Sequence, residues 1–224
     1  MPREMTAEQN LVVQGVTIPK IGFTKLSPDG LDADGVPRQL AESLERLGTD
    51  YVDLLLIHWP NPDVALEETL GAMEALRRQG DTRAIGVSNF PSALLERALE
   101  LAPVVANQVE YHAYLAQPEL LAMARDHDVA IAAYRPLADS RLMDDEVLRD
   151  IGAAHAKTAG QVALRWLLDQ PKVVALPKSG SHDNRAANLD VFDFDLDDDE
   201  RGRIAELALR EERTIDPPFA PDWD

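Results

Sequence analysis

The sequence has 224 residues, 22 of them basic and 40 acidic, so its formal net charge is −18. This charge excludes a nucleic-acid partner, because binding to phosphates requires a basic surface. With 45% hydrophobic and 28% charged residues the composition is that of a folded globular protein, and the absence of cysteine excludes disulfides, thiolate catalysis and cysteine-ligated metal sites.

The first half of the chain alternates helical and strand patterns. Two short apolar segments, 11–13 and 16–18, flank Gly15 and favour an N-terminal β-hairpin. Apolar residues at helical spacing predict helices over 36–47, 67–79, 92–101 and 118–126. The first two are expected to end at Gly48 and Gly80. The continuous apolar run over 52–57 predicts a strand buried on both faces, and further strands are expected over 83–87, 104–109 and 129–133.

The last third predicts further helices and one strand. An acidic stretch over 145–155 has a helical pattern, and Thr158 with Gln161 forms a predicted capping box before a helix that runs to Leu168. Residues 173–176 predict a strand, and residues 197–200 predict the start of another helix. The tail from Thr214 to Asp224 is rich in proline and aspartate and is expected to be irregular.

Alternating strands and helices indicate an α/β fold with a parallel sheet. Six barrel strands are expected, the first near Ile18 to Leu26. A complete (β/α)₈ TIM barrel takes about 250 residues, or roughly 31 per unit. The sequence therefore predicts an incomplete barrel of this type, with about six βα units in a single domain over residues 1–224 that no linker interrupts.

Polar residues follow the predicted strands at their carboxyl ends, where the active sites of parallel barrels lie. These positions are 24–26, 58–60, 88–90, 107–112, 134–137 and 177–179. No pair of histidines has the spacing of a metal site, so no metal is expected.

Several of these segments, taken in order, resemble the aldo-keto reductases, in particular their prokaryotic diketogluconate-reductase-like branch. The similarity runs from Leu11 to about Leu207. Its most specific parts are GTDYVDL at 48–54 with HWP at 58–60, GVSNF at 86–90 and NQVEYH at 107–112. The resemblance implies a barrel enzyme that reduces small aldehydes or ketones with NADP, or with NAD.

The resemblance also implies roles for the residues at the predicted catalytic centre. Lys25 matches the lysine that lowers the pKa of a catalytic tyrosine, and His58 matches the histidine that orients the carbonyl. A cation beside a phenol favours the phenolate, and a neutral imidazole can donate a hydrogen bond to a developing alkoxide. Trp59 matches a position in the substrate pocket.

For the cofactor, the resemblance implies two groups of residues. Ser88, Asn89 and Gln108 match residues that hold the nicotinamide carboxamide, and Tyr134 matches the ring that stacks on the nicotinamide. Lys178 and Ser179 match the pyrophosphate and 2′-phosphate site, and Asn188 matches an adenine contact. The family arginine for the 2′-phosphate falls on Asn184 by spacing, and Arg185 follows one residue later.

One departure from the family lies before Lys25. There the family continues with a helix, a strand bearing a catalytic Asp and Tyr, and a second helix, whereas Phe23 is joined directly to Thr24 in this chain. The expected proton donor is therefore absent, and the tyrosines at 51, 111, 114 and 134 all match other positions. The sequence leaves three hypotheses: an impaired reductase, an inactive nucleotide-binding pseudoenzyme, or a truncated remnant.

Structural readings of the same residues stay open at this point. Lys25 would also suit a solvent-exposed loop, and His58 would suit a core position in which its hydrogen bonds are satisfied. Trp59 and Tyr134 would also suit packing against other side chains. Ser88 and Asn89 would also suit the cap of the helix that begins near Ser92, and Lys178 with Arg185 a solvated face.

Charge and chain ends lead to further expectations. No apolar run approaches the roughly 20 residues of a membrane span, and the polar start lacks the apolar stretch of a signal peptide, so a cytoplasmic protein is expected. A barrel that lacks two strands exposes unpaired edges, which favours self-association.

The high negative charge suggests adaptation to a salt-rich cytoplasm, because salt screens the repulsion between acidic residues. We expect Tm to rise by several degrees between low and molar potassium chloride. An unchanged Tm would support an ordinary acidic protein instead.

Overall fold

A parallel sheet of six strands organises the fold in the computed structural model, which describes residues 11–13, 16–18 and 22–224. The strands follow the order β3-β4-β5-β6-β7-β8, and the pairs β3–β4, β4–β5, β5–β6 and β7–β8 are parallel. A separate antiparallel pair, β1 (Leu11–Val13) with β2 (Val16–Ile18), confirms the predicted hairpin, whose turn lies outside the described residues. The predicted α/β class with about six strand–helix units is confirmed.

Contacts between residues divide the chain into two compact units. The first unit comprises Met1–Gln108, Ala122–Ala130 and Pro218–Asp224, and the second comprises Val109–Leu121 and Ile131–Pro217. The strands β6 (Val104–Glu110) and β7 (Ala130–Tyr134) and the helix α4 (Pro118–Asp126) contribute to both units. The single-domain expectation stays a prediction.

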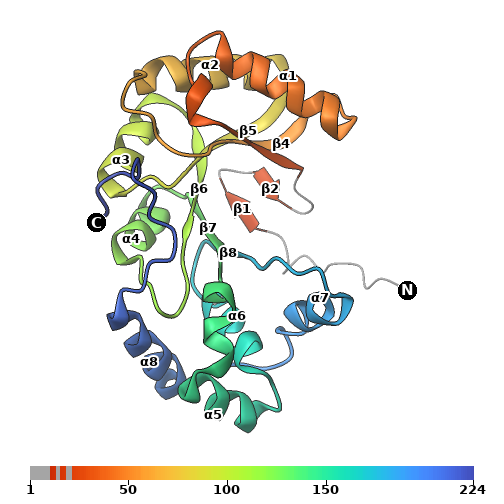
Figure 1. The fold of residues 1–224 in the computed structure, drawn as a ribbon, viewed down its shortest axis with the longest axis vertical. Coiled ribbons are helices and arrows are strands. Elements are labelled where there is room, and N and C mark those ends of the chain that lie inside the picture. The colour runs from red at the N-terminus through yellow and green to blue at the C-terminus, as the bar shows by residue number, and fades with distance from the viewer. Residues whose placement is uncertain (1–10, 14–15, 19–21) are drawn as a thin grey trace. The chain divides into compact units, whose positions relative to one another are not determined.

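The first unit places three helices around four strands. Its strands are β3 (Phe23–Leu26), β4 (Val52–Ile57), β5 (Thr82–Ser88) and the first part of β6. Its helices are α1 (Gly35–Leu47), α2 (Leu66–Gln79) and α3 (Ser92–Leu101), preceded by the 3₁₀ helix η2 (Pro28–Gly30). Helices α1 and α2 lie side by side, with α1 packed on β3 and α2 on β5 (Figure 1).

The second unit is mostly helical around the end of β7 and β8 (Val173–Leu176). Its helices are α5 (Glu146–His155), α6 (Ala159–Leu168), α7 (His182–Leu189) and α8 (Asp198–Leu207), with 3₁₀ helices η3 (Ala138–Asp144) and η4 (Ala208–Arg210). Helix α6 is apolar and almost wholly buried, because it packs on β8, α5, α7 and α8 (Figure 1). The whole unit is therefore built around this one helix.

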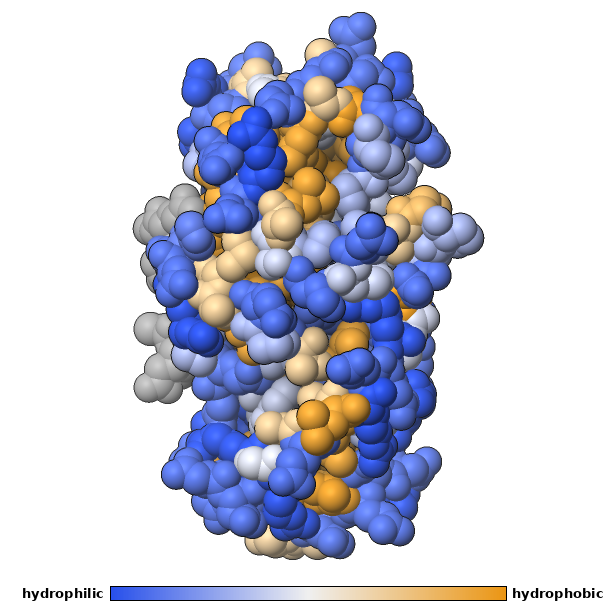
Figure 2. All heavy atoms as spheres, turned by 90° about the vertical axis from the view of Figure 1, so that its left-hand side faces the viewer, coloured by the Kyte–Doolittle hydropathy of each residue, from blue (hydrophilic) through white to orange (hydrophobic). Residues whose placement is uncertain are grey.

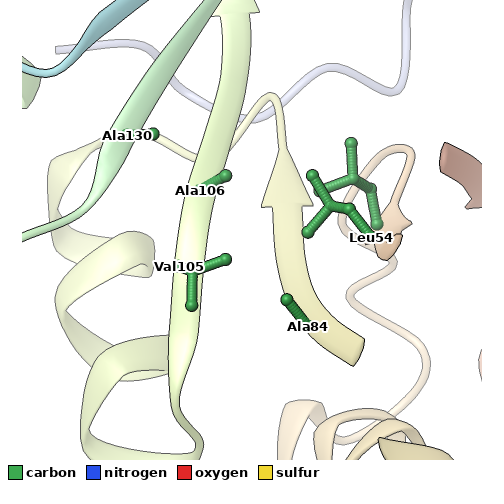
Figure 3. Close-up of a cluster of buried hydrophobic side chains, with 6 residues drawn as sticks. Leu54, Ala84, Val105, Ala106 and Ala130 are labelled. Carbon is green, nitrogen blue, oxygen red and sulfur yellow. The ribbon is translucent and has the colours of Figure 1, made fainter. Parts of the chain in front are cut away.

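Small and branched side chains meet inside the first unit. Leu54 and Leu56 of β4, Ala84 of β5, Val105 and Ala106 of β6 and Ala130 form one buried cluster (Figure 3). Gly86 lies among these strands, and a Cβ there would sit 2.6 Å from Leu56 Cδ2 and 2.7 Å from the carbonyl oxygen of Ala106. Only glycine therefore allows β5 and β6 to approach this closely.

The helices begin and end close to the predicted residues, because the predicted capping residues occupy the capping positions. Gly48 and Gly80 end α1 and α2 in the left-handed conformation, with φ of 66° and 95°. Thr158 and Gln161 form the predicted capping box of α6. Asp197 caps α8 in the same way, through Glu200. These side chains satisfy amide groups that the first turn of a helix leaves without partners.

Two features differ from the sequence-based expectation. The first barrel strand covers only Phe23–Leu26, because residues 16–18 pair within the hairpin and residues 19–21 lie outside the described part. Helix α7 was not predicted, since its sequence has no apolar face and none of its residues is buried. Its one local signal is Ser181, whose hydroxyl accepts a hydrogen bond from the amide of Asn184.

The face shown in Figure 2 is largely hydrophilic, with hydrophobic residues gathered in patches. None of the helices in the described residues is both long and apolar enough to span a membrane.

Candidate active site

Four neighbouring strands of the first unit bring polar residues together at their carboxyl ends. Lys25 lies on β3, opposite Leu56 of β4, and His58 follows directly after β4. The amide of His58 donates to the carbonyl oxygen of Leu26 at 3.0 Å, which continues the β3–β4 pairing to the end of the strands. On the next pair, Ser88 of β5 lies opposite Gln108 of β6.

A direct contact joins the outer two of these strands. The Lys25 Nζ atom donates to Gln108 Oε1 at 2.7 Å, although β3 and β6 are three strand spacings apart, about 14 Å in a flat sheet. The contact is possible because the strands curve, so that side chains on the inner face converge. The curvature of the first unit therefore brings the predicted catalytic lysine to a predicted cofactor residue.

Ser88 and Asn89 are held by the strand ends and not by the following helix. The Ser88 hydroxyl donates to the Gln108 carbonyl oxygen at 2.7 Å, and Asn89 Nδ2 donates to the His58 carbonyl oxygen at 2.9 Å. Asn89 has a φ of 62°, a conformation that asparagine tolerates better than most residues. The first amide group of α3 binds the Asp224 carboxylate, so these contacts give no support to the alternative reading of Ser88 and Asn89 as a cap of α3.

The environment lowers the pKa of both basic groups. Burial lowers the pKa of Lys25 below its ordinary value. Burial and, to a smaller extent, the positive charge of Lys25 lower the pKa of His58. The imidazole is therefore neutral at neutral pH and can donate a hydrogen bond to a carbonyl oxygen. Both side chains are partly exposed and can be reached by a small molecule.

Trp59 is buried against the end of the chain. Its ring packs edge-on against Phe219 and Trp223, with centroids 5.6 and 6.1 Å away. The packing interpretation of Trp59 is therefore supported, and its contact with substrate stays a prediction. Beside it lies an apolar cavity of about 300 Å³ between the loop after β4, the start of α3 and residues 219–221, and none of the polar residues of the Lys25 cluster lines it.

The remaining predicted cofactor residues belong to the second unit. Tyr134 ends β7, and burial together with the negative charge of Glu110 raises its pKa well above the ordinary value. Its carbonyl oxygen accepts from the amide of Tyr111 at 3.4 Å. The phenol thus stays protonated, which suits an aromatic surface for stacking.

The loop after β8 and the start of α7 carry the rest of this group. Lys178 is exposed, and Arg185 Nη1 donates to the carbonyl oxygens of Ser179 and Gly180 at 3.3 and 3.0 Å. Asn188 lies one turn further along α7 and is partly exposed. Two cations therefore lie beside the amino end of a helix, an arrangement that favours anions.

Sequence reasoning missed the role of Glu110. Its carboxylate is fully buried and accepts hydrogen bonds from His112, from the amide and hydroxyl of Thr214 and from the amide of Ile215. The amide of Tyr114 donates to His112 Nδ1, so the proton of this imidazole is on Nε2 and faces Glu110. The signal in the sequence was an acidic residue at the end of the apolar run 104–109.

Comparison with known proteins agrees with this arrangement. The profile of the Aldo/keto reductase family matches residues 20–209. The chain belongs to this family. Methylglyoxal reductase DkgB of Escherichia coli O157:H7 is 36% identical to it over 206 residues, which cover 90% of this chain and 77% of the relative.

Solved structures of aldo-keto reductases share the fold. A candidate 2,5-diketo-D-gluconic acid reductase B superposes with a TM-score of 0.88 at 40% identity, covering 90% of this chain and 73% of that one. A Bombyx mori aldo-keto reductase in complex with NADP superposes with a TM-score of 0.80 at 33% identity, covering 87% and 69%. The family expected from the motifs is confirmed.

The described part of the first unit holds one tyrosine, Tyr51, and this residue lies far from Lys25 and His58. Tyr51 precedes β4, at the opposite end from His58, so about 20 Å of strand separates them. Its hydroxyl accepts from Arg83 Nη2 at 2.8 Å. In the second unit, the Tyr111 hydroxyl donates to Gln170 and that of Tyr114 to Asp145. These three hydroxyls already have partners within their own unit.

The described residues contain no group of three or more histidine, aspartate or glutamate side chains that could hold a metal ion. Among the other histidines, His155 is bonded to Glu200 at 2.8 Å and acts in packing between α5 and α8.

Proposed function

We propose that this chain binds NADP(H) and reduces small aldehydes or ketones slowly, because it lacks the tyrosine that donates a proton in its family. One observation carries the proposal: Lys25 and His58 lie together with Gln108 at one end of the first unit, and the only tyrosine described there lies at the other end.

The names of its relatives support the substrate and the cofactor. The Escherichia coli relative is named a methylglyoxal reductase, and the Bombyx mori structure contains NADP. Methylglyoxal is a small carbonyl compound, so this related chain, with Lys25 and His58 at its candidate site, should accept substrates of this class.

The residues present fit a nicotinamide. The Gln108 side chain uses Oε1 to accept from Lys25, and its Nε2 group has no hydrogen-bond partner among the described residues. This amide can donate to a carboxamide oxygen, with Ser88 and Asn89 beside it. In the second unit, Tyr134 would stack on the ring and Asn188 would contact adenine. Lys178, Ser179 and Arg185 would hold the phosphates.

The chemistry that remains follows from these groups. NADPH, when bound, supplies a hydride. His58 would hold the carbonyl oxygen through a hydrogen bond from its neutral imidazole, which stabilises negative charge on that oxygen. Water or the Lys25 ammonium would have to deliver the proton. Loss of a positioned acid typically lowers the rate by about 10²–10⁴-fold, so turnover is expected to be slow.

An internal deletion would explain the missing tyrosine. We propose that the segment bearing the catalytic Asp and Tyr of the family is absent between Phe23 and Thr24. The family match covers most of this chain but only 77% of the Escherichia coli relative, which supports a shortened chain. The alternative is a pseudoenzyme that binds the nucleotide without turnover. A truncated remnant would neither bind the nucleotide nor catalyse the reduction.

Fluorescence titration with NADPH, combined with its consumption in the presence of methylglyoxal, separates these hypotheses. Saturable binding with slow consumption supports the impaired reductase. Binding without consumption supports the pseudoenzyme, and the absence of both supports the remnant.

Arg185 should decide the preference for NADPH over NADH. Its guanidinium lies beside the exposed loop 178–180, so Arg185→Ala is expected to weaken NADPH binding about tenfold, with little effect on NADH, since a charged hydrogen bond contributes about 1.5 kcal/mol or more. Arg125→Ala, on exposed α4, is the matched control. An equal loss of affinity for NADPH and NADH would show that Arg185 does not bind the 2′-phosphate.

Edge strands should make the protein self-associate. In the described residues β3 and β8 each have one hydrogen-bonded neighbour, and Phe23 on β3 is 38% exposed. Unpaired backbone groups beside an apolar side chain recruit further chains. Light scattering should show oligomers at micromolar concentration, and Phe23→Lys should reduce them. A monodisperse monomer of the unaltered protein would contradict this expectation.

A further inference from the structure

Lys25 differs from Lys157 in its partner. Its Nζ atom donates to a neutral amide oxygen, Gln108 Oε1, and it forms no ion pair with any carboxylate of the described residues. Lys157, by contrast, pairs with Asp190 and Asp193 at 2.9 and 2.7 Å. A carboxylate stabilises an ammonium ion strongly, whereas an amide oxygen does so less.

The surroundings of Lys25 also favour its neutral form. The side chain is half-buried at the end of β3, and burial lowers its pKa from the ordinary 10.5. The neighbouring His58 is neutral and offers no negative charge. A larger fraction of the amine is therefore unprotonated at a given pH than for an exposed lysine, and only the unprotonated amine is a nucleophile.

We propose that Lys25 forms a covalent imine with small aldehydes. The lone pair of Nζ attacks the carbonyl carbon, a C–N bond forms, and the oxygen takes up a proton to give a carbinolamine. Loss of the nitrogen proton and departure of the hydroxyl group as water then give the C=N bond. The net reaction joins one amine and one aldehyde and releases one water, with no oxidation or reduction.

Two neighbours fit this chemistry. Gln108 Oε1 holds the amine at the inner face of the strands, and His58 follows directly after β4. The imidazole of His58 can donate a proton to the carbinolamine oxygen and accept one from nitrogen. The inference goes beyond the proposed reductase, because it requires no nucleotide and no tyrosine.

Reductive trapping tests it. The intact protein is incubated with benzaldehyde and sodium cyanoborohydride, without nucleotide, at a pH of about 8. Peptide mass spectrometry then measures the rate of benzylation at each of the five lysines, 20, 25, 157, 172 and 178. We expect Lys25 to react several-fold faster than exposed Lys178, since a lowered pKa raises the unprotonated fraction of its amine at this pH.

Variants make the result specific. Gln108→Glu places a carboxylate beside the amine and should slow benzylation of Lys25 about tenfold, whereas Gln79→Glu, at the exposed end of α2, should leave it unchanged. In the unaltered protein, benzylation of Lys25 should reach half its maximal rate at a lower pH than benzylation of Lys178 does. This measurement needs no variant. Reaction of Lys25 no faster than Lys178, or no slowing in Gln108→Glu, would overturn the proposal. Because the reaction mixture contains no nucleotide, failure of NADPH binding would not affect this result.

Discussion

Restoring the catalytic tyrosine is expected to raise the rate of methylglyoxal reduction with NADPH by about 10²–10⁴-fold. The change inserts, between Phe23 and Thr24, the helix–strand–helix segment that the family pattern places there. Lys25 and His58 are already close enough for their charges to interact, so a phenol placed beside them would complete the proton-donating group. The measurement is kcat/KM from NADPH consumption.

The control carries the same insertion with its catalytic tyrosine replaced by phenylalanine. This variant should fold as the insertion does and keep the low rate of the unaltered chain. Circular dichroism and Tm establish that both variants are folded. If the two folded variants had equal rates, the missing phenol would not be the cause of slow turnover.

Replacing Glu110 with glutamine is expected to lower the free energy of unfolding by about 3 kcal/mol, which corresponds to a Tm decrease of about 6–12 °C in a chain of this size. The buried carboxylate accepts hydrogen bonds at 3.0, 2.8, 2.6 and 2.9 Å from His112, Thr214 and Ile215. An amide NH₂ group in place of one oxygen would face donors and leave buried groups without partners. Chemical denaturation measures the loss, with exposed Glu119→Gln as the control.

The contribution of Glu110 should depend on pH. Burial opposes its ionisation, but hydrogen bonds from His112, Thr214 and Ile215 outweigh burial and lower its pKa from 4.5 to about 2. Because the folded pKa lies below the unfolded one, this contribution is fully present above pH 4.5 and is lost as the pH falls toward 2.

The stability difference between the unaltered protein and Glu110→Gln should therefore shrink over this pH range. A difference that stayed constant would show that the ionised carboxylate does not contribute as described.

The elements that could be predicted are those whose local signals agree with their packing. Strand β4 is a continuous apolar run, and α6 has both a capping box and an apolar sequence, so pattern and burial indicate the same element. Helix α7 could not be predicted in this way, because it buries no residue and its apolar positions show no helical spacing. The beginning of β3 was misplaced because residues 16–18 have a strand pattern but pair within the hairpin.

The candidate site was predictable in its residues but not in its contacts. Motif order gave Lys25, His58 and Gln108, whereas the hydrogen bond between Lys25 and Gln108 depends on the curvature of four strands. Two partners of Glu110, Thr214 and Ile215, lie 104 and 105 residues further along the chain, and no local pattern indicates such a contact. The cap that Asp224 provides for α3 is equally distant in sequence.

The most direct test of the proposed function is a single-turnover experiment in which the protein, saturated with NADPH, is mixed with excess methylglyoxal and oxidation of the bound nucleotide is followed. We predict saturable binding and oxidation at least about 100-fold slower than the roughly 10 s⁻¹ typical of enzymes. Oxidation at that typical rate would contradict the account, because it would show that a proton donor other than the missing tyrosine serves this site efficiently.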